Sequence, residues 1–82
     1  MNGARTVSLY VAQGCHLCDV AREALETLRQ DVPFTIAETD ITGDVELERT
    51  YREWVPVVEI EGERISVYRV EEGLVRHKLA SM

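Results

Sequence analysis

Near its beginning, the chain alternates apolar and polar side chains, as a half-buried β-strand does. Val7, Leu9 and Val11 fall on one side of this stretch, and Ser8 and Tyr10 fall on the other. A period of two with β-branched and aromatic residues is typical of strands. The pattern therefore predicts a strand over residues 5–12, with its apolar side turned toward the core.

The spacing of apolar positions changes to that of a helix between residues 17 and 30. The positions that fall on one helical face are Leu17, Ala21, Ala24, Leu25 and Leu28. Such spacing is typical of an amphipathic helix that covers a core. The helix is expected to end before Pro33, because the residue before a proline avoids the helical conformation.

The middle of the chain predicts one more strand and one more helix. Residues 34–38 are expected to form a strand with Phe34 and Ile36 on one face. The second helix is expected to begin near Asp44, a good capping residue, and to end at about Glu53. The expected inner edge of this helix consists of Leu47, Tyr51 and Trp54.

The last third of the chain predicts a hairpin followed by a helix. Residues 57–60 and 65–68 have the composition of strands, and Glu61-Gly62-Glu63 has that of a turn. Residues 70–80 predict a helix with three inner positions, Leu74, Val75 and Leu79. The order β-α-β-α-β-β-α indicates an α/β fold in a single domain over residues 1–82, with a four-stranded mixed sheet flanked by three helices.

The composition of the chain excludes several classes of protein. The hydrophobic fraction of 45% predicts a folded globule. The formal net charge is -6, and Lys and Arg do not cluster, which argues against a nucleic acid or an anionic membrane as partner. No stretch has the length of a membrane span or of a signal-peptide core. We therefore expect a monomeric, cytoplasmic protein.

Two cysteines, Cys15 and Cys18, stand where the first strand gives way to the first helix. Unpaired N–H groups and the positive end of the helix dipole favour an anion at that point, and a thiolate is such an anion. Cys15 is expected to be the partly exposed nucleophile, and Cys18, one turn on, to close onto it. In a reducing cytosol such a pair indicates a cycling dithiol or a metal site rather than a permanent disulfide. A C-x-x-C near a β-α-β pattern is a signal of thioredoxin-like redox work.

The stretch Cys15-His16-Leu17-Cys18-Asp19, the element order and Val55-Pro56-Val57 together resemble the glutaredoxin-like family of the thioredoxin superfamily, in its compact bacterial C-H-L-C-D form. The resemblance spans nearly the whole chain and implies the thioredoxin-like fold, and it implies that the proline lies against the C-x-x-C. It implies a thiol-disulfide oxidoreductase of electron transport and cell redox homeostasis. In that family the residue matching Cys15 attacks a target disulfide, and the residue matching Cys18 resolves the mixed disulfide.

The resemblance also implies where a substrate binds. The peptide bond before Pro56 is expected to be cis, and the backbone of Val55 to be free to pair with a bound peptide or with glutathione. Gly14 and Leu17 beside the cysteines, and Trp54 beside the proline, complete the predicted substrate-binding residues. For Trp54 the alternative is a side chain that caps the core.

Three places depart from the pattern of glutaredoxins that use glutathione, which usually have a Lys before the first Cys, Thr-Val-Pro, and a Gly-Gly-x-Asp turn. Here these places hold Gln13, Trp54 and the sequence Val-Glu-Glu-Gly at 70–73. Glutathione carries carboxylates, so the missing cation and the acids Glu71 and Glu72 should weaken its binding. We expect no bound cofactor, and glutathione at most as a weakly held co-substrate.

His16 and Asp19 are the residues predicted to tune the redox potential. A protonated imidazole beside Cys15 would stabilise the thiolate, whereas a carboxylate in the first turn competes with the thiolate for the positive helix end. The plainer alternative for His16 is a solvated loop side chain. The remaining candidates are predicted to be packing residues (Tyr10, Tyr51 and Tyr68) and a surface residue (His77).

Two other functions stay open at this point. One is a metal-binding module that uses both thiolates with His16 or His77, although a closed zinc site needs four ligands and C-x-x-C supplies two. The other is a non-catalytic adaptor with the same fold. For the redox function the expected partners are a disulfide-bearing protein or small-thiol substrate, and a reductant that the sequence does not identify.

Overall fold

The computed structural model describes residues 5–80. Along the chain the elements are β1 (Arg5–Val11), α1 (His16–Arg29), β2 (Phe34–Asp40), α2 (Val45–Tyr51), β3 (Val57–Ile60), β4 (Glu63–Val67) and α3 (Glu72–Ala80). The predicted order β-α-β-α-β-β-α is confirmed. Boundaries differ from the prediction by one or two residues at most ends, because capping and pairing geometry, rather than composition, decides where an element stops.

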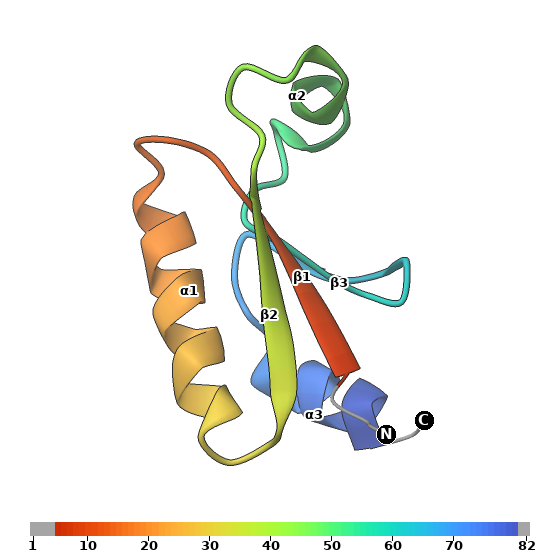
Figure 1. Ribbon diagram of the computed structural model, residues 1–82. Coiled ribbons are helices and arrows are strands. Elements are labelled where there is room, and N and C mark those ends of the chain that lie inside the picture. The colour runs from red at the N-terminus through yellow and green to blue at the C-terminus, as the bar shows by residue number, and fades with distance from the viewer. Residues whose placement is uncertain (1–4, 81–82) are drawn as a thin grey trace.

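The four strands form one mixed sheet in the order β2-β1-β3-β4. β1 and β2 are parallel, with α1 as the connection between them, whereas β3 runs antiparallel to β1 and to β4 (Figure 1). Glu61 and Gly62 join β3 to β4 with φ angles of 53° and 80°. Two positive φ angles in a row match the twist of a tight hairpin, and the glycine takes one of them at no steric cost.

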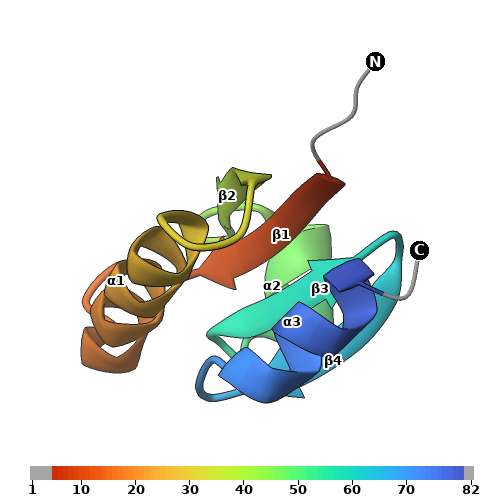
Figure 2. The same ribbon diagram turned by 90° about the horizontal axis from the view of Figure 1, so that it is seen from below.

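The main core lies between the sheet and the helices α1 and α3, which cover the same face (Figure 2). The largest contributions come from Val7, Leu9 and Val11 on β1, Ala21, Leu25 and Leu28 on α1, Val58 and Ile60 on β3, and Val75 and Leu79 on α3. The predicted inner side of the first strand is thus confirmed.

In α1 and α3, three predicted inner positions are wrong. Leu17 and Leu74 are 51% and 52% exposed, and Ala24 is exposed as well. In α1 the buried face begins at Cys18, which is 1% exposed, and continues through Ala21. A face that contains Cys18 leaves Leu17 turned outward, because neighbouring residues lie about 100° apart around a helix.

The opposite face of the sheet meets only α2, which has no buried residue. The ring of Tyr51 stacks on that of Tyr10 with centroids 4.1 Å apart, and its hydroxyl donates a hydrogen bond to Glu59 at 3.0 Å. The helix ends at Tyr51, two residues before the predicted end, because the N–H groups of Trp54 and Val55 both donate to the Tyr51 carbonyl. Trp54 was predicted to lie on the inner edge of this helix, and that prediction is wrong. The residue lies beyond the helix end and is 40% exposed.

Candidate active site

The register of the sheet brings the cysteines and the proline to the same end of the molecule. Tyr10 of β1 lies opposite Val57 of β3 in an antiparallel pair. Continuing that register places Val55-Pro56 beside residues 11–12, the end of β1 that leads into Cys15. Two segments 40 residues apart in the chain are therefore neighbours, as the resemblance implied.

Cys15 is the N-cap residue of α1. Its Sγ accepts a hydrogen bond from the N–H of Cys18 at 3.2 Å, and its carbonyl accepts from the N–H of Asp19 at 3.4 Å. The two cysteines are joined by a disulfide, with Cα atoms 5.2 Å apart. Cys18 is 1% exposed, whereas Cys15 is only partly buried. A sulfur at Cys15 thus meets both the solvent and the positive end of the helix.

The loop before Cys15 is shaped by its backbone. Gly14 has a φ angle of 74°, in the left-handed region that glycine adopts without strain. The N–H of Gln13 donates to Oγ1 of Thr42 at 2.9 Å, which ties this loop to the one after β2. Gly14 was predicted to bind substrate. In the structure it forms the turn that leads from the loop into the helix at Cys15.

The peptide bond between Val55 and Pro56 is cis. Pro56 is fully buried. The N–H of Val55 donates to the carbonyl of Tyr51 at 3.1 Å, so this N–H is not free, contrary to the expectation from the family. The Val55 carbonyl accepts no hydrogen bond from residues 5–80, which leaves it available to a bound chain.

Exposed apolar side chains gather at this end of the sheet. Trp54 is 40% exposed and Tyr68 47% exposed, and their ring centroids lie 6.1 Å apart. The N–H of Tyr68 donates to the carbonyl of Pro56 at 2.8 Å, which holds the tyrosine beside the proline. We call these two side chains, Trp54 and Tyr68, the apolar rim.

Tyr68 is the site residue that sequence reasoning missed, since it was predicted to pack inside. The register of the hairpin, which includes a bulge, explains its place. Val67 of β4 lies opposite Val57, the residue after Pro56, so the residue that follows Val67 must lie at the proline. The φ angle of 71° at Tyr68 turns the chain there.

The charged groups next to the cysteines form a network centred on Arg22. Its guanidinium donates to Glu38 through two nitrogens, at 2.8 and 2.7 Å, and to Asp19 at 2.8 Å. The hydrogen bonds from Arg22 hold the pKa of Glu38 below its ordinary value, and those to the carboxylates raise the pKa of Arg22. Asp19, predicted to oppose the thiolate, is thus ion-paired, and His16 lies exposed at the first position of α1.

The two acids expected to repel glutathione also have partners. Glu71 pairs with Arg69 at 2.8 Å, and Glu72 pairs with Arg76 at 3.0 Å. Their charges are therefore partly balanced within the chain. The missing cation at Gln13 remains as the stronger reason to expect weak glutathione binding.

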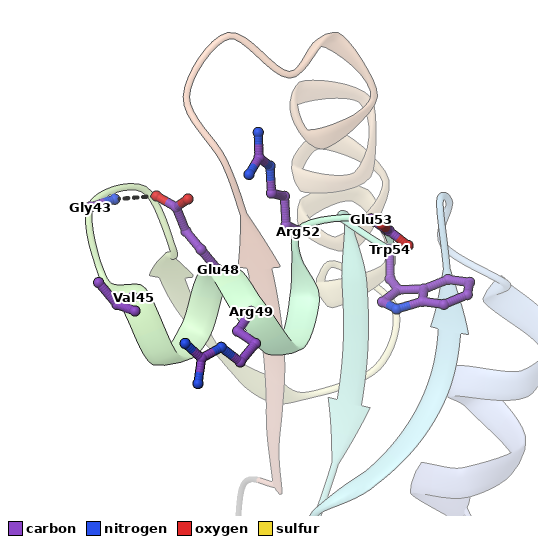
Figure 3. Close-up of a pocket in the computed structure, with 7 residues that line it drawn as sticks. All are labelled: Gly43, Val45, Glu48, Arg49, Arg52, Glu53 and Trp54. Carbon is purple, nitrogen blue, oxygen red and sulfur yellow. Dashed lines mark hydrogen bonds between the residues drawn. The ribbon is translucent and has the colours of Figure 1, made fainter.

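A cavity of about 560 Å³ lies along α2 rather than over the disulfide (Figure 3). Within it Glu48 accepts a hydrogen bond from the N–H of Gly43 at 2.7 Å. Trp54 is the one predicted site residue in its lining, which consists of Gly43, Val45, Glu48, Arg49, Arg52, Glu53 and Trp54. The cavity and the apolar rim therefore share a single side chain.

Metal ligands do not converge in the described part of the chain. Over residues 5–80, no group of three or more His, Cys, Asp or Glu side chains could hold a metal ion. His77 lines a small depression with Ile65 and Leu74, between β4 and α3. A metal bound by Cys15 and Cys18 would need further ligands from outside residues 5–80.

Among the helices of residues 5–80, none combines the length and the apolar character needed to cross a membrane.

Comparisons with known proteins agree with this geometry. Residues 6–80 match the family model described as glutaredoxin-like domain (DUF836). The solution structure of protein Ne2328 from Nitrosomonas europaea is 25% identical, covers 95% of this chain and 94% of its own, and superposes with a TM-score of 0.83. The X-ray structure of XcR50 from X. campestris is 30% identical over 93% of this chain and 97% of its own, with a TM-score of 0.74.

The thioredoxin fold extends to more distant proteins. Thioredoxin 1 from Thermosipho africanus TCF52B is 13% identical over 93% of this chain and 96% of its own, with a TM-score of 0.63. At that identity the likeness concerns the fold alone. The comparison with curated proteins finds no relative of the chain.

Proposed function

The chain belongs to the glutaredoxin-like domain family (DUF836), and from its cysteine geometry we propose that it is a dithiol-disulfide oxidoreductase. One observation carries the proposal: of two cysteines in disulfide range, Cys15 caps the N-terminus of α1 and is partly exposed, whereas Cys18 is buried behind it. This asymmetry suits one sulfur to attack and the other to resolve.

The proposed cycle begins with the reduced pair. The thiolate of Cys15 attacks one sulfur of a target disulfide, which forms a mixed disulfide and releases the other target sulfur as a thiolate that takes up a proton. Cys18 loses its proton and attacks Sγ of Cys15, which expels the second target thiol. Two electrons have then passed to the target, and the Cys15–Cys18 disulfide remains. An external thiol reductant reverses these steps on the protein.

Protein disulfides are the proposed substrates. The apolar rim offers Trp54 and Tyr68 to side chains next to a client cysteine, and Leu17 is exposed in the first turn of α1 beside the cysteines. The Val55 carbonyl offers a hydrogen-bond acceptor to the client backbone. Glutathione disulfide is a weaker candidate, because the loop before Cys15 carries Gln13 instead of a cation. No resident cofactor takes part in this cycle, since both sulfurs come from the chain.

We further propose that the protein works in the cytoplasm as a monomer. Thiol systems there keep dithiols reduced, so the disulfide form would be returned to the dithiol after each turnover. One chain supplies both Cys15 and Cys18, so the cycle needs no second copy.

The test combines a redox titration with trapping. Wild-type protein in glutathione and dithiothreitol buffers, followed by Trp54 fluorescence and thiol labelling, should show one reversible two-electron transition. The Cys18→Ser variant should accumulate a mixed disulfide with a disulfide-bearing peptide, because nothing resolves it. Cys15→Ser, the matched control, should accumulate none. Unreactive thiols, or equal trapping by the two variants, would overturn the proposal.

A further inference from the structure

The position of the Asp19 carboxylate is the observation from which this inference starts. Asp19 lies in the first turn of α1, where the positive end of the helix attracts a carboxylate. Here its Oδ1 instead accepts a hydrogen bond from Nη1 of Arg22, one turn further along the helix. The carboxylate is therefore drawn away from the end of the helix that carries Cys15.

Arg22 is held in place from outside the helix. Glu38 of β2 binds the guanidinium through both carboxylate oxygens, a paired geometry that fixes its orientation. An arginine with only Asp19 as partner could follow that carboxylate wherever it moved. Anchored to the neighbouring strand, Arg22 instead sets where Asp19 rests.

We infer that Arg22 is a positioning residue for the thiol chemistry of Cys15: it holds the Asp19 carboxylate away from the positive end of α1 and leaves that end to the thiolate. This inference rests on the proposed function, in which Cys15 is the attacking thiol. Arg22 acts through Asp19 and does not contact the reacting sulfur.

A direct effect of the Arg22 charge on Cys15 has to be separated from its effect through Asp19. The guanidinium lies at the Asp19 carboxylate, with Nη1 2.8 Å from Oδ1, so the two opposite charges are close together and largely offset each other at Cys15. Removing the guanidinium releases the carboxylate and also takes away a positive charge. Only a background without the Asp19 carboxylate distinguishes these two effects.

Other charged groups at this end of the sheet are accounted for separately. They are His16 on α1, Asp40 at the end of β2, Arg52 and Glu53 before the cis proline, and the Arg69–Glu71 pair before α3. Asp40 lies near Glu38 and accepts a hydrogen bond from the N–H of Thr42 at 2.9 Å. None of them is a partner of Asp19 or Arg22, so exchanging Arg22 leaves them unchanged.

The test measures the alkylation rate of Cys15 by iodoacetamide against pH in the reduced protein. Arg22→Gln should raise the midpoint of the profile by roughly half a pH unit, the size expected for a carboxylate at a helix N-terminus. Below the midpoint this corresponds to a rate about threefold lower. The matched control is Arg29→Gln, which removes the same i, i+3 type of pair, with Glu26, from the other end of α1 and should leave the midpoint unchanged.

A double variant decides the mechanism. In the Asp19→Asn background, Arg22→Gln should shift the midpoint by less than half as much, because no carboxylate is left to release. An unmoved midpoint in Arg22→Gln, or an equal shift in both backgrounds, overturns the inference alone. A wild-type protein with no titrating thiol overturns the proposed function together with it. Circular dichroism confirms that each variant is folded.

Discussion

The two faces of the sheet are covered in different ways. On one face α1 and α3 enclose a continuous apolar core, in which Leu9 and Leu25 are fully buried. On the other face α2 buries none of its residues and is attached by the stacked rings of Tyr10 and Tyr51. The hydroxyl of Tyr51 is bonded to Glu59, and the guanidinium carbon of Arg64 lies 6.0 Å from its ring centroid.

The difference shows that stability and site geometry come from different halves of the molecule. Cys18 belongs to the apolar core, so the cysteine motif is held by the well-packed half. Tyr51 belongs to the lightly packed half, and its carbonyl accepts hydrogen bonds from the N–H groups of Trp54 and Val55. The substrate side of the site is thus positioned by α2, a helix that contributes little to the core.

The largest effect is expected from a cavity in the apolar half. Leu25→Ala should lower the free energy of unfolding by about 2–5 kcal/mol, because the buried side chain leaves a hole between α1 and the sheet. Leu17→Ala, on the same helix but 51% exposed, should change it by about 0.5 kcal/mol or less. Urea unfolding followed by circular dichroism measures both. Equal losses would mean that the burial described for α1 is wrong.

A smaller effect is expected on the face of the sheet that α2 covers. Tyr51→Phe keeps the ring stack but removes the hydrogen bond to Glu59, which should cost about 1 kcal/mol at neutral pH. Burial, together with hydrogen bonds to Tyr10 and Glu59, raises the pKa of Tyr51 above its ordinary value of 10.0. A raised pKa stabilises the fold fully below pH 10 and progressively less above it, because the unfolded chain then ionises first.

Urea unfolding at neutral and alkaline pH tests this prediction. The stability difference between wild type and Tyr51→Phe should shrink above pH 10. Tyr68→Phe is the matched control, since Tyr68 is 47% exposed, and it should show neither effect. A difference that is unchanged with pH would show that the hydroxyl acts only through packing.

The same contrast explains what could be predicted from the sequence. The face of the sheet toward α1 and α3 follows from alternation, since Val7, Leu9 and Val11 can be buried only on one side of a strand. Alternation does not predict how the other face, which α2 covers, is packed. Tyr51 and Tyr10 were predicted to pack, but a stack between them depends on where α2 ends, and that end is set by hydrogen bonds of residues beyond the helix.

The candidate site was partly predictable for a similar reason. The spacing of Cys15 and Cys18 predicted a redox pair, and the family resemblance predicted a cis peptide bond before Pro56. The exposure of Tyr68 and the occupied N–H of Val55 depend on strand register and on a helix end. Those are properties of pairs of distant residues, and a pattern read along one chain does not contain them.

The smallest expected effect lies at the edge of the apolar face, where Arg22 ties α1 to Glu38 of β2. The hydrogen bonds from Arg22 lower the pKa of Glu38 below its ordinary value of 4.5. A carboxyl with a lowered pKa stabilises the fold above that ordinary value, and the contribution is lost as the pH falls through the lowered one. Because both side chains are partly exposed, solvent screens the pair, and Glu38→Gln should lower the urea midpoint at neutral pH by less than Tyr51→Phe does.

The difference in urea midpoint between wild type and Glu38→Gln should vanish in acid, where Glu38 of the wild type is itself protonated. Urea midpoints of wild type and Glu38→Gln, from neutral pH down to well below the lowered pKa of Glu38, measure it. Glu23→Gln on the outer side of α1 is the control, since Glu23 is exposed and makes no ion pair with residues 5–80, and its midpoint should follow wild type throughout. A loss in Glu38→Gln that persists at low pH would show that the shape of the side chain, rather than its charge, joins α1 to the sheet.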